Sequence, residues 1–485
     1  MGVSPRQPGV PHPPSFVRRL RLPILLACLL GLLSAPAAEA ARDQTVLFEA
    51  PRDLLDAQAR PGALHQLEQL GVHALRVVLL WKNVAPGPDA TTRPRFDAAD
   101  PAAYDWGQYD AVLQAARERG WQVLLTVSGP VPRWATAGAV DNVTRPDPQE
   151  FQAFMTAVGR HYGQQVKLFS IWNEPNEPVF LAPQFQNHAP ASPRIYRGLF
   201  QAGVAGLRAS GNFAGMRVLM GETAPRGTGN VVAPLTFLRG ALCLDAQYRR
   251  ASSCSPLPID GYAHHAYTTR AGPGFIPPGR NDVTIGVLGR LTSALDRAAA
   301  AGAIPAGTPI YLTEFGIQSA PDPVFGVSLA QQAEYIAISE RIAYANRRVR
   351  FFSQYLLRDD VPRSGPPAQR YGGFESGLEF AGGAAKPSYS AWPVPLAVTR
   401  SGSRVSLWGL ARPARGATDV AVEVADGRGA FHRLLTRHTN SLGYWTAHSS
   451  YRRGRRWRVR WTSPAGVAYV GPAIRAYDAH VRPAA

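Results

Sequence analysis

The stretch FSIWNEPNEP, residues 169–178, decides how the chain is interpreted. A short hydrophobic run ends there in Asn173 and Glu174, and a proline follows at once. An ionised carboxylate is costly to bury, and proline cannot donate a hydrogen bond to a strand ladder. The pattern therefore predicts either a simple turn or a buried strand that presents its last carboxylate for chemistry.

Seven similar runs accompany this one: VLFEA (46–50), ALRVVLLW (74–81), WQVLLTVSG (121–129), MRVLMGE (216–222), IDGYAHHAY (259–267), PIYLTEFG (309–316) and RFFSQYLL (350–357). The segments between them, such as YDAVLQAARERG (109–120), repeat apolar residues at three- and four-residue steps, which is typical of helices. Eight strand–helix units over residues 41–395 predict a (β/α)8 TIM barrel. An open doubly wound sheet is the rival, but no Gly-rich phosphate loop follows the first strand.

The last ninety residues, 396–485, show short runs divided by Gly- and Pro-rich turns. In RRWRVRW (455–461) apolar residues alternate strictly with arginines, which indicates a half-buried antiparallel strand. This segment is expected to form a small β-sandwich domain. It carries 15 arginines and four acidic residues, so it contributes +11 of the net charge of +18. Its arginine face is either solvated or binds an anionic cell-wall or polysaccharide surface.

Residues 1–40 have the features of a secretory signal peptide: a basic segment, the apolar run LPILLACLLGLL (22–33) and Ala38-Glu39-Ala40. An uncleaved or lipid anchor is the alternative, and the expected location is extracellular. Nucleic acid is not an expected partner of an exported chain. Removal of the signal peptide would leave two cysteines, Cys243 and Cys254. They are expected to form a disulfide, because an exported protein enters an oxidising compartment.

Reactive side chains of a (β/α)8 barrel lie at the C-terminal ends of its strands. Several predicted strands carry polar residues or end in them: Arg76, Asn173, Glu174, Glu222, His265, Tyr267 and Glu314. Glu174 and Glu314, on the fourth and seventh strands, would face each other across the mouth of the barrel. Glycoside hydrolysis needs such a pair, one acid to protonate the leaving oxygen and one carboxylate to attack the anomeric carbon. Glu222 would be a third acid or, more simply, a structural or sugar-binding partner.

With these residues in place, the barrel region resembles the clan A glycoside hydrolases, which include families 5, 39 and 30. In that group an Asn-Glu pair ends strand 4 and a second Glu ends strand 7. The resemblance implies that Glu174 is the general acid/base, that Glu314 is the nucleophile, and that Asn173 hydrogen-bonds the sugar 2-hydroxyl.

The resemblance extends to two further strands. It implies that Arg76 lies beside the nucleophile and that His265 and Tyr267 match a His-x-Tyr pattern whose Tyr bonds the nucleophile. The chain departs from the pattern at Ser128, where many family 5 members have His, and at Tyr355, near the usual position of a Trp.

The chemistry predicted from these residues is retaining hydrolysis of an oligo- or polysaccharide by a monomer that needs no metal and no organic cofactor. Trp134, in a loop after the third strand, is a candidate platform for a sugar ring. A non-catalytic carbohydrate-binding barrel and a metal-dependent hydrolase are the alternatives. His264 and His265 are adjacent on one strand and so point to opposite faces, which disfavours a shared metal.

Overall fold

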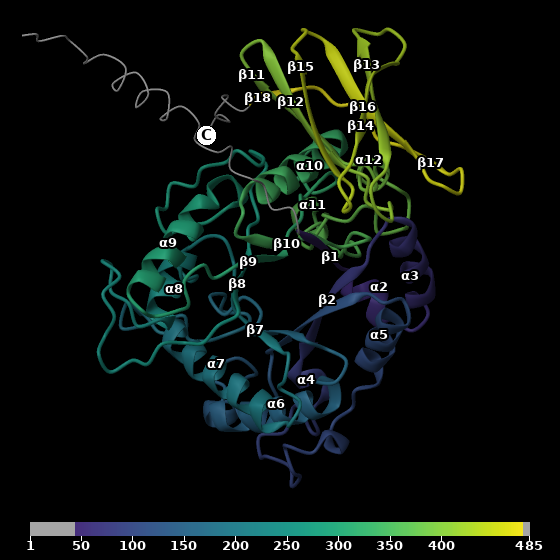
Figure 1. Cartoon of the computed structure of the whole chain (residues 1–485). Helices are drawn as coiled ribbons and strands as arrows, with labels where there is room; N and C mark the ends of the chain where they lie inside the picture. Colours follow the sequence, from purple (N-terminus) through teal and green to yellow (C-terminus); the bar gives the residue numbers. More distant parts are fainter. Residues whose placement is uncertain (1–43, 479–485) are drawn as a thin grey trace, which may run out of the picture. The chain divides into compact units, whose positions relative to one another are not determined.

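The computed structural model describes residues 44–478, and the predicted signal peptide lies outside them. Eight parallel strands close into a barrel in the order β1-β10-β9-β8-β7-β4-β3-β2. Their bounds are β1 (Thr45–Glu49), β2 (Ala74–Leu80), β3 (Gln122–Ser128), β4 (Leu168–Ile171), β7 (Arg217–Thr223), β8 (Gly261–His265), β9 (Ile310–Glu314) and β10 (Val349–Tyr355). Figure 1 shows them at the centre of a ring of helices. The predicted TIM barrel is confirmed.

Helices follow the strands as the periodicity predicts: α2 (Pro51–Leu55), α3 (Arg60–Gln69), α4 (Trp81–Val84), α5 (Gly107–Glu118), α6 (Pro148–Tyr162), α7 (Ser192–Ala209), α8 (Pro234–Ala241), α9 (Gly289–Ala300) and α10 (Leu329–Ala345). Two short helices, α11 (Pro367–Arg370) and α12 (Pro387–Ala391), come after the last barrel strand. Side chains satisfy free N–H groups at the helix starts: Asp147 caps α6, and Ser328 and Gln331 form a capping box on α10.

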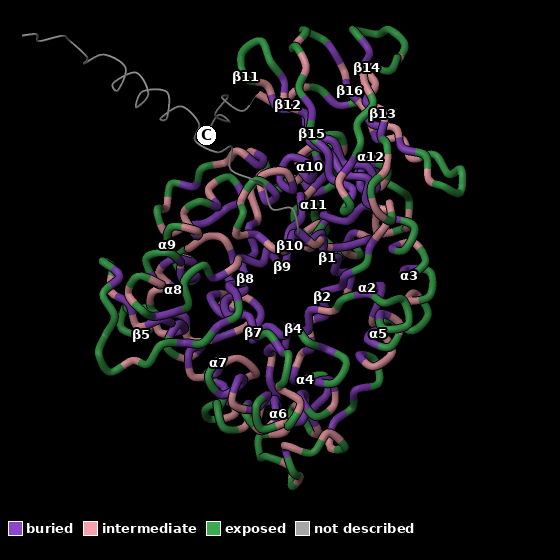
Figure 2. Tube along the Cα trace, in the orientation of Figure 1, coloured by how far each residue is buried: buried purple, intermediate pink, exposed green. Residues whose placement is uncertain are grey.

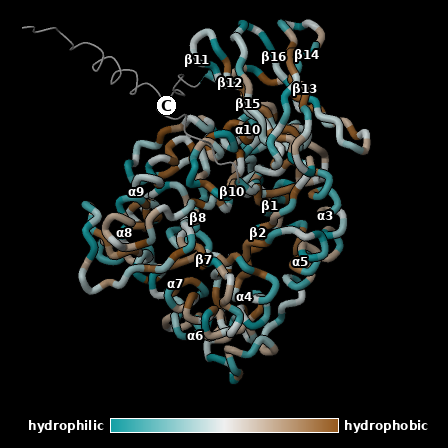
Figure 3. Tube along the Cα trace, in the orientation of Figure 1, coloured by the Kyte–Doolittle hydropathy of each residue, from teal (hydrophilic) through white to brown (hydrophobic). Residues whose placement is uncertain are grey.

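The interior of the barrel is filled by an apolar layer with one residue from each strand: Leu47, Ala74, Leu124, Leu168, Leu219, Ala263, Tyr311 and Phe351. Side chains alternate along a strand, so the residues two positions further on point inward as well. On β1, β2 and β8 these are Glu49, Arg76 and His265. The apolar layer therefore lies beneath a layer of polar side chains at the C-terminal end of the barrel. Figures 2 and 3 show that the strands at the centre are buried and hydrophobic, whereas the outer loops are exposed.

A β-sandwich follows the barrel, as predicted. One sheet has the order β15-β12-β11-β18 and the other β14-β13-β16-β17. The strands are β11 (Leu396–Ser401), β12 (Arg404–Leu410), β13 (Asp419–Asp426), β14 (His432–His438), β15 (Tyr444–Ser450), β16 (Arg455–Thr462), β17 (Ala468–Val470) and β18 (Tyr477–Asp478). The facing sides of the two sheets share one apolar core.

The first of these sheets also packs against the barrel helix α10. Ala397, Trp408 and Tyr444 form a buried cluster with Ile338 and Tyr344 of that helix. Both faces of this sheet are therefore covered. Arg456, Arg458 and Arg460 of β16 lie on the outer face of the second sheet, where they are half exposed.

Cys243 and Cys254 are bonded, as predicted. Within residues 44–478, every helix is too short or too polar to cross a membrane.

Candidate active site

Two irregularities of the strands complete the polar layer. The pairing of β7 with β8 shifts register between Gly221 and Thr223, and Glu222 itself has a φ of 49°. A second shift lies in the pairing of β8 with β9 and aligns His265 with Glu314. Bulges of this kind redirect side chains next to functional sites. Here they add two carboxylates to the ring of inward-facing residues.

The WNEP turn that follows β4 positions Glu174. The strand ends at Ile171, three residues before the predicted end, because Trp172 and Glu174 adopt positive φ angles of 72° and 37°. Such angles are unfavourable for these residues, and they persist where the surroundings fix them. The Glu174 N–H donates to the Glu222 carbonyl at 3.0 Å, and the Asn173 N–H donates to the Ser128 hydroxyl at 2.9 Å.

Arg76 is the cationic centre of the site and is 1% exposed. Its Nη1 donates to Oε2 of Glu314 at 2.8 Å and also to Glu49. Its Nη2 donates to Glu222 and to Oδ1 of Asn173, each at 2.5 Å. One guanidinium therefore fixes side chains from four other strand ends.

His265 joins the two predicted catalytic carboxylates. Its Nδ1 lies 2.8 Å from Oε1 of Glu174 and 3.7 Å from Oε2 of Glu314. One oxygen of each carboxylate and one nitrogen of His265 all lie within 4.8 Å of one another. The hydroxyl of Tyr267 donates to the other oxygen of Glu314 at 2.7 Å. The structure thus brings Glu174 and Glu314 together on either side of one imidazole nitrogen.

The pKa values in this cluster diverge because the charges are buried together. Burial raises the pKa of Glu174, and the charge of Glu314 adds to this while the hydrogen bond from His265 opposes it. Burial also raises the pKa of Glu49, to about 7, although Arg76 works against it. Burial would raise the pKa of Glu222 too, but Arg76 and His265 outweigh it and lower that pKa to about 2.

Burial alone would lower the pKa of His265. The carboxylates of Glu314, Glu174 and Glu222 overcome this effect and raise it to about 10. The ring is therefore an imidazolium at neutral pH and donates its Nδ1 proton to Glu174. A metal ion between these side chains would have to displace that proton, so we assign the three side chains as a hydrogen-bonded network.

His264 faces away from the site, as adjacent positions on a strand require. Its ring contacts the Thr223 hydroxyl at 2.9 Å and the Val283 carbonyl at 2.8 Å. Burial lowers its pKa to about 4, so the ring is neutral.

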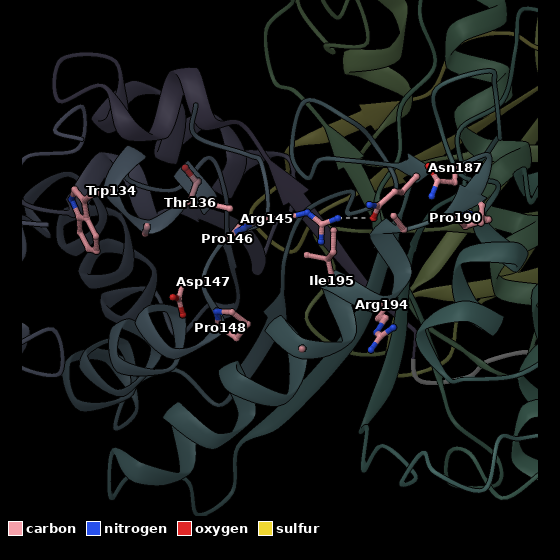
Figure 4. Close-up of a pocket in the computed structure, with 16 residues that line it drawn as sticks. Trp134, Thr136, Arg145, Pro146, Asp147, Pro148, Asn187, Pro190, Arg194 and Ile195 are labelled. Atoms are coloured by element: carbon pink, nitrogen blue, oxygen red, sulfur yellow. Dashed lines mark hydrogen bonds between the residues drawn. The ribbon is translucent and has the colours of Figure 1, made fainter. Parts of the chain in front are cut away.

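Trp134 is 8% exposed and lies edge-on to Trp81 and Phe96. It also lines a cavity of about 820 Å³ formed by the loop after β3, the start of α6 and the hairpin of β5 (Phe185–Gln186) and β6 (Ala189–Pro190). Figure 4 shows this cavity, in which Arg145 donates to Gln186 at 2.7 Å. Glu174 and Glu314 are not among its lining residues. The sugar-stacking role of Trp134 stays a prediction.

Three residues of the site were not predicted from the sequence. Glu49 ends β1, just as Glu314 ends β9, so the same strand-end signal could have found it. Thr126 donates from its hydroxyl to Glu222 at 2.9 Å, and nothing in its sequence context marks it. Phe374 comes from the long segment after β10, and its ring lies 6.1 Å from that of Tyr267.

No protein-family profile and no curated protein matches the chain by sequence. Among solved structures, it is similar to a monomeric β-xylosidase from Caulobacter crescentus CB15, with 17% identity, a TM-score of 0.51, and coverage of 90% of this chain and 98% of that one. It is also similar to a glucosidase from Croceicoccus marinus, with 12% identity, a TM-score of 0.50, and coverage of 87% and 95%. The polypeptide therefore shares its fold with two glycosidases over most of its length.

Proposed function

We propose that this protein is a retaining glycoside hydrolase with Glu174 as general acid/base and Glu314 as nucleophile. The observation that carries the proposal is the approach of one oxygen of Glu174 and one of Glu314 to within 4.8 Å. Retaining glycosidases keep their carboxyl groups about 5–5.5 Å apart, whereas inverting enzymes need about 6.5–9.5 Å to admit a water molecule. The spacing here favours the retaining reaction.

The contacts of each carboxylate suit the role proposed for it. Both oxygens of Glu314 accept hydrogen bonds, one from Arg76 and one from Tyr267, which stabilises the attacking anion. Glu174 has a raised pKa and an 18% exposed side chain, so it can deliver a proton to a bound glycosidic oxygen. Attack by Glu314 gives a glycosyl ester, and the leaving group departs with the proton of Glu174.

The second half of the reaction reverses the proton transfer. Esterification removes the negative charge of Glu314, which is one cause of the raised pKa of Glu174. That pKa should therefore fall in the intermediate, and the ionised Glu174 can take a proton from the attacking water. The hydrolysed sugar leaves with its original anomeric configuration.

The test compares Glu174→Gln, Glu314→Gln and a control, Glu177→Gln, which changes a carboxylate three residues from the acid. Aryl xylosides and aryl glucosides are the first substrates to try, given the two similar structures. Glu314→Gln should lower kcat about 10³-fold or more on every substrate. Glu174→Gln should lose most activity on poor leaving groups and retain more on nitrophenyl glycosides, which need no protonation to depart.

Product stereochemistry, followed by NMR, separates the retaining from the inverting reaction. Near wild-type turnover by either variant of the catalytic pair would overturn the residue assignment. Tight binding of an oligosaccharide that is never cleaved would support the non-catalytic alternative instead.

A second part of the proposal is that the protein is secreted and acts as a monomer, and that the arginine face of the sandwich contacts an anionic cell-wall or polysaccharide surface. Arg458 lies 4.1 Å from the Phe431 ring centroid, and it shares Glu423 with Arg460. Stacked guanidinium groups keep donor edges free for carboxylate or phosphate groups. The double variant Arg458→Gln, Arg460→Gln should elute from an anionic polysaccharide column at lower salt; unchanged elution would refute this contact.

A further inference from the structure

The exposed apolar side chains of this protein gather at one end of the barrel. Nine large apolar residues are exposed among residues 44–478, and seven lie on loops that follow barrel strands: Val140, Val179, Ile276, Val324, Phe325, Val361 and Phe374. The other two, Leu442 and Val467, lie in hairpin turns of the sandwich. The described loops at the opposite end of the barrel carry none. Scattered exposed apolar residues are normal, but this one-sided distribution is not what scatter produces.

Five of the seven belong to the loops after three adjacent strands, β8, β9 and β10. We call Ile276, Val324, Phe325, Val361 and Phe374 the apolar rim. Ile276 is 55% exposed, Phe325 59% and Val361 64%, so water covers more than half of each. These loops share the face of the barrel that carries Glu174 and Glu314.

The exposed charges of the same three loops are all positive. Arg270, Arg280, Arg363 and Arg370 are exposed on them. Their acidic residues are buried or half-buried: Asp282, Asp322, Asp359, Asp360, Glu375 and Glu379. Asp282 accepts the Gly227 N–H, and Asp359 pairs with Lys386 at 2.6 Å. The acids therefore hold the loops together, while the arginines remain available to a partner.

We propose that the apolar rim and its four arginines dock the catalytic face on an anionic lipid bilayer. Proteins that lie on bilayers insert apolar tips at the headgroup boundary and place Lys and Arg near the phosphates. A bilayer accepts apolar tips that come from separate loops, whereas a folded partner needs a contiguous complementary surface. The exposed positive charge complements anionic lipid headgroups.

Docking in this orientation turns the carboxylate pair toward the bilayer. The glycan that it would cleave is then one displayed on a lipid surface, and this consequence rests on the proposed function. The docking itself does not rest on the proposed function, because it depends only on the apolar rim and the four arginines. A failed hydrolase assay with intact vesicle binding, or the reverse, would separate the two proposals.

The experiment measures partition of the purified full chain onto vesicles by flotation. Vesicles of phosphatidylcholine alone are compared with vesicles that contain about one third phosphatidylglycerol. We expect binding to the anionic vesicles that weakens with salt, and little binding to the neutral ones. The triple variant Ile276→Ser, Val324→Ser, Phe325→Ser should lower the partition constant about 10-fold or more, because the apolar contact is lost.

Arg363→Gln with Arg370→Gln should give a similar loss and a weaker dependence on salt. The matched control is Leu442→Ser with Val467→Ser, which removes two equally exposed apolar residues of the sandwich and should leave binding unchanged. Urea midpoints confirm that each variant is folded. Phe325→Trp supplies a second measurement: its added fluorescence should be quenched by brominated lipid, whereas that of Leu442→Trp should not. Absence of binding to anionic vesicles, or full binding by the triple variant, would overturn the proposal.

Discussion

The buried ion pair between the barrel and the sandwich gives a stability prediction. Arg412 follows β12 and donates to both carboxylate oxygens of Glu340 on α10, at 3.2 and 2.8 Å. Its Nε donates to the Trp392 carbonyl, and its guanidinium lies 3.9 Å from the Trp392 ring centroid. Glu340 is fully buried and Arg412 is 6% exposed. The perturbation is Arg412→Met, which keeps the apolar stem and removes the charge.

The expected loss of stability follows from the carboxylate that this substitution leaves unpaired. Methionine leaves the Glu340 carboxylate buried without its cation, and breaking a buried pair in this way costs about 3–5 kcal/mol. The double variant Arg412→Met, Glu340→Leu removes both charges and should recover most of that loss. A surface pair is the control: Arg249 and Asp245 are bridged at 2.6 Å, but the Arg249 side chain is 79% exposed. Arg249→Gln should cost less than about 1 kcal/mol.

Urea unfolding of the full chain measures these differences as shifts of the first transition. The same interface predicts that truncation after residue 395 exposes Ile338 and strips Glu340 of its partner, so the isolated barrel should aggregate or unfold at far lower urea. The reasoning is refuted if Arg412→Met lowers the free energy of unfolding by no more than Arg249→Gln does. It is also refuted if the double variant loses as much stability as Arg412→Met and a single Glu340→Leu variant lose when their losses are added. Either result would mean that the pair does not couple the two domains.

Two further predictions concern pH. His265→Gln removes a cation that lowers the pKa of Glu174, so the alkaline limb of the kcat/KM profile should move to higher pH; a limb that stays in place would refute this contact. Glu222 has its pKa lowered from 4.5 to about 2, so the stability it contributes, about 3 kcal/mol, is present above pH 4.5 and lost as the pH falls towards 2. The gap between wild-type and Glu222→Gln urea midpoints should therefore narrow over that interval, and a constant gap would contradict it.

The eight barrel strands could be predicted because each is a continuous hydrophobic run flanked by amphipathic segments, as burial on both faces requires. The sandwich was harder. The run of β16 was predicted from its alternation of Trp and Arg. The run of β14, His432–His438, was not, because this edge strand is mostly polar and mostly exposed. Edge strands carry weak hydrophobic patterns, since only one side of the ladder constrains them.

The residues of the candidate site likewise fall into those that the sequence predicts and those that it does not. Glu314 ends β9, while Glu174 and Tyr267 follow the ends of β4 and β8 within three residues, and strand order alone brings the three to one face. The contact of Arg76 with Glu222 depends on the bulge at Gly221, which hydrophobic periodicity does not reveal. Phe374 arrives from a segment whose path is set by tertiary contacts, such as the hydrogen bond of its N–H with Asp360.

The contacts within the site suit the different parts that we propose for Glu174 and Glu314. Arg76 and His265 are both cations, and several carboxyl groups face them. Glu222, with a pKa of about 2, is one of these. Glu314 is another, and donors from Arg76 and Tyr267 meet both of its oxygens. Glu174 has a raised pKa and a single donor, His265, which suits the proton donor of the proposed reaction. The proposed proton donor and the proposed nucleophile thus differ in the number of hydrogen-bond donors that each one faces.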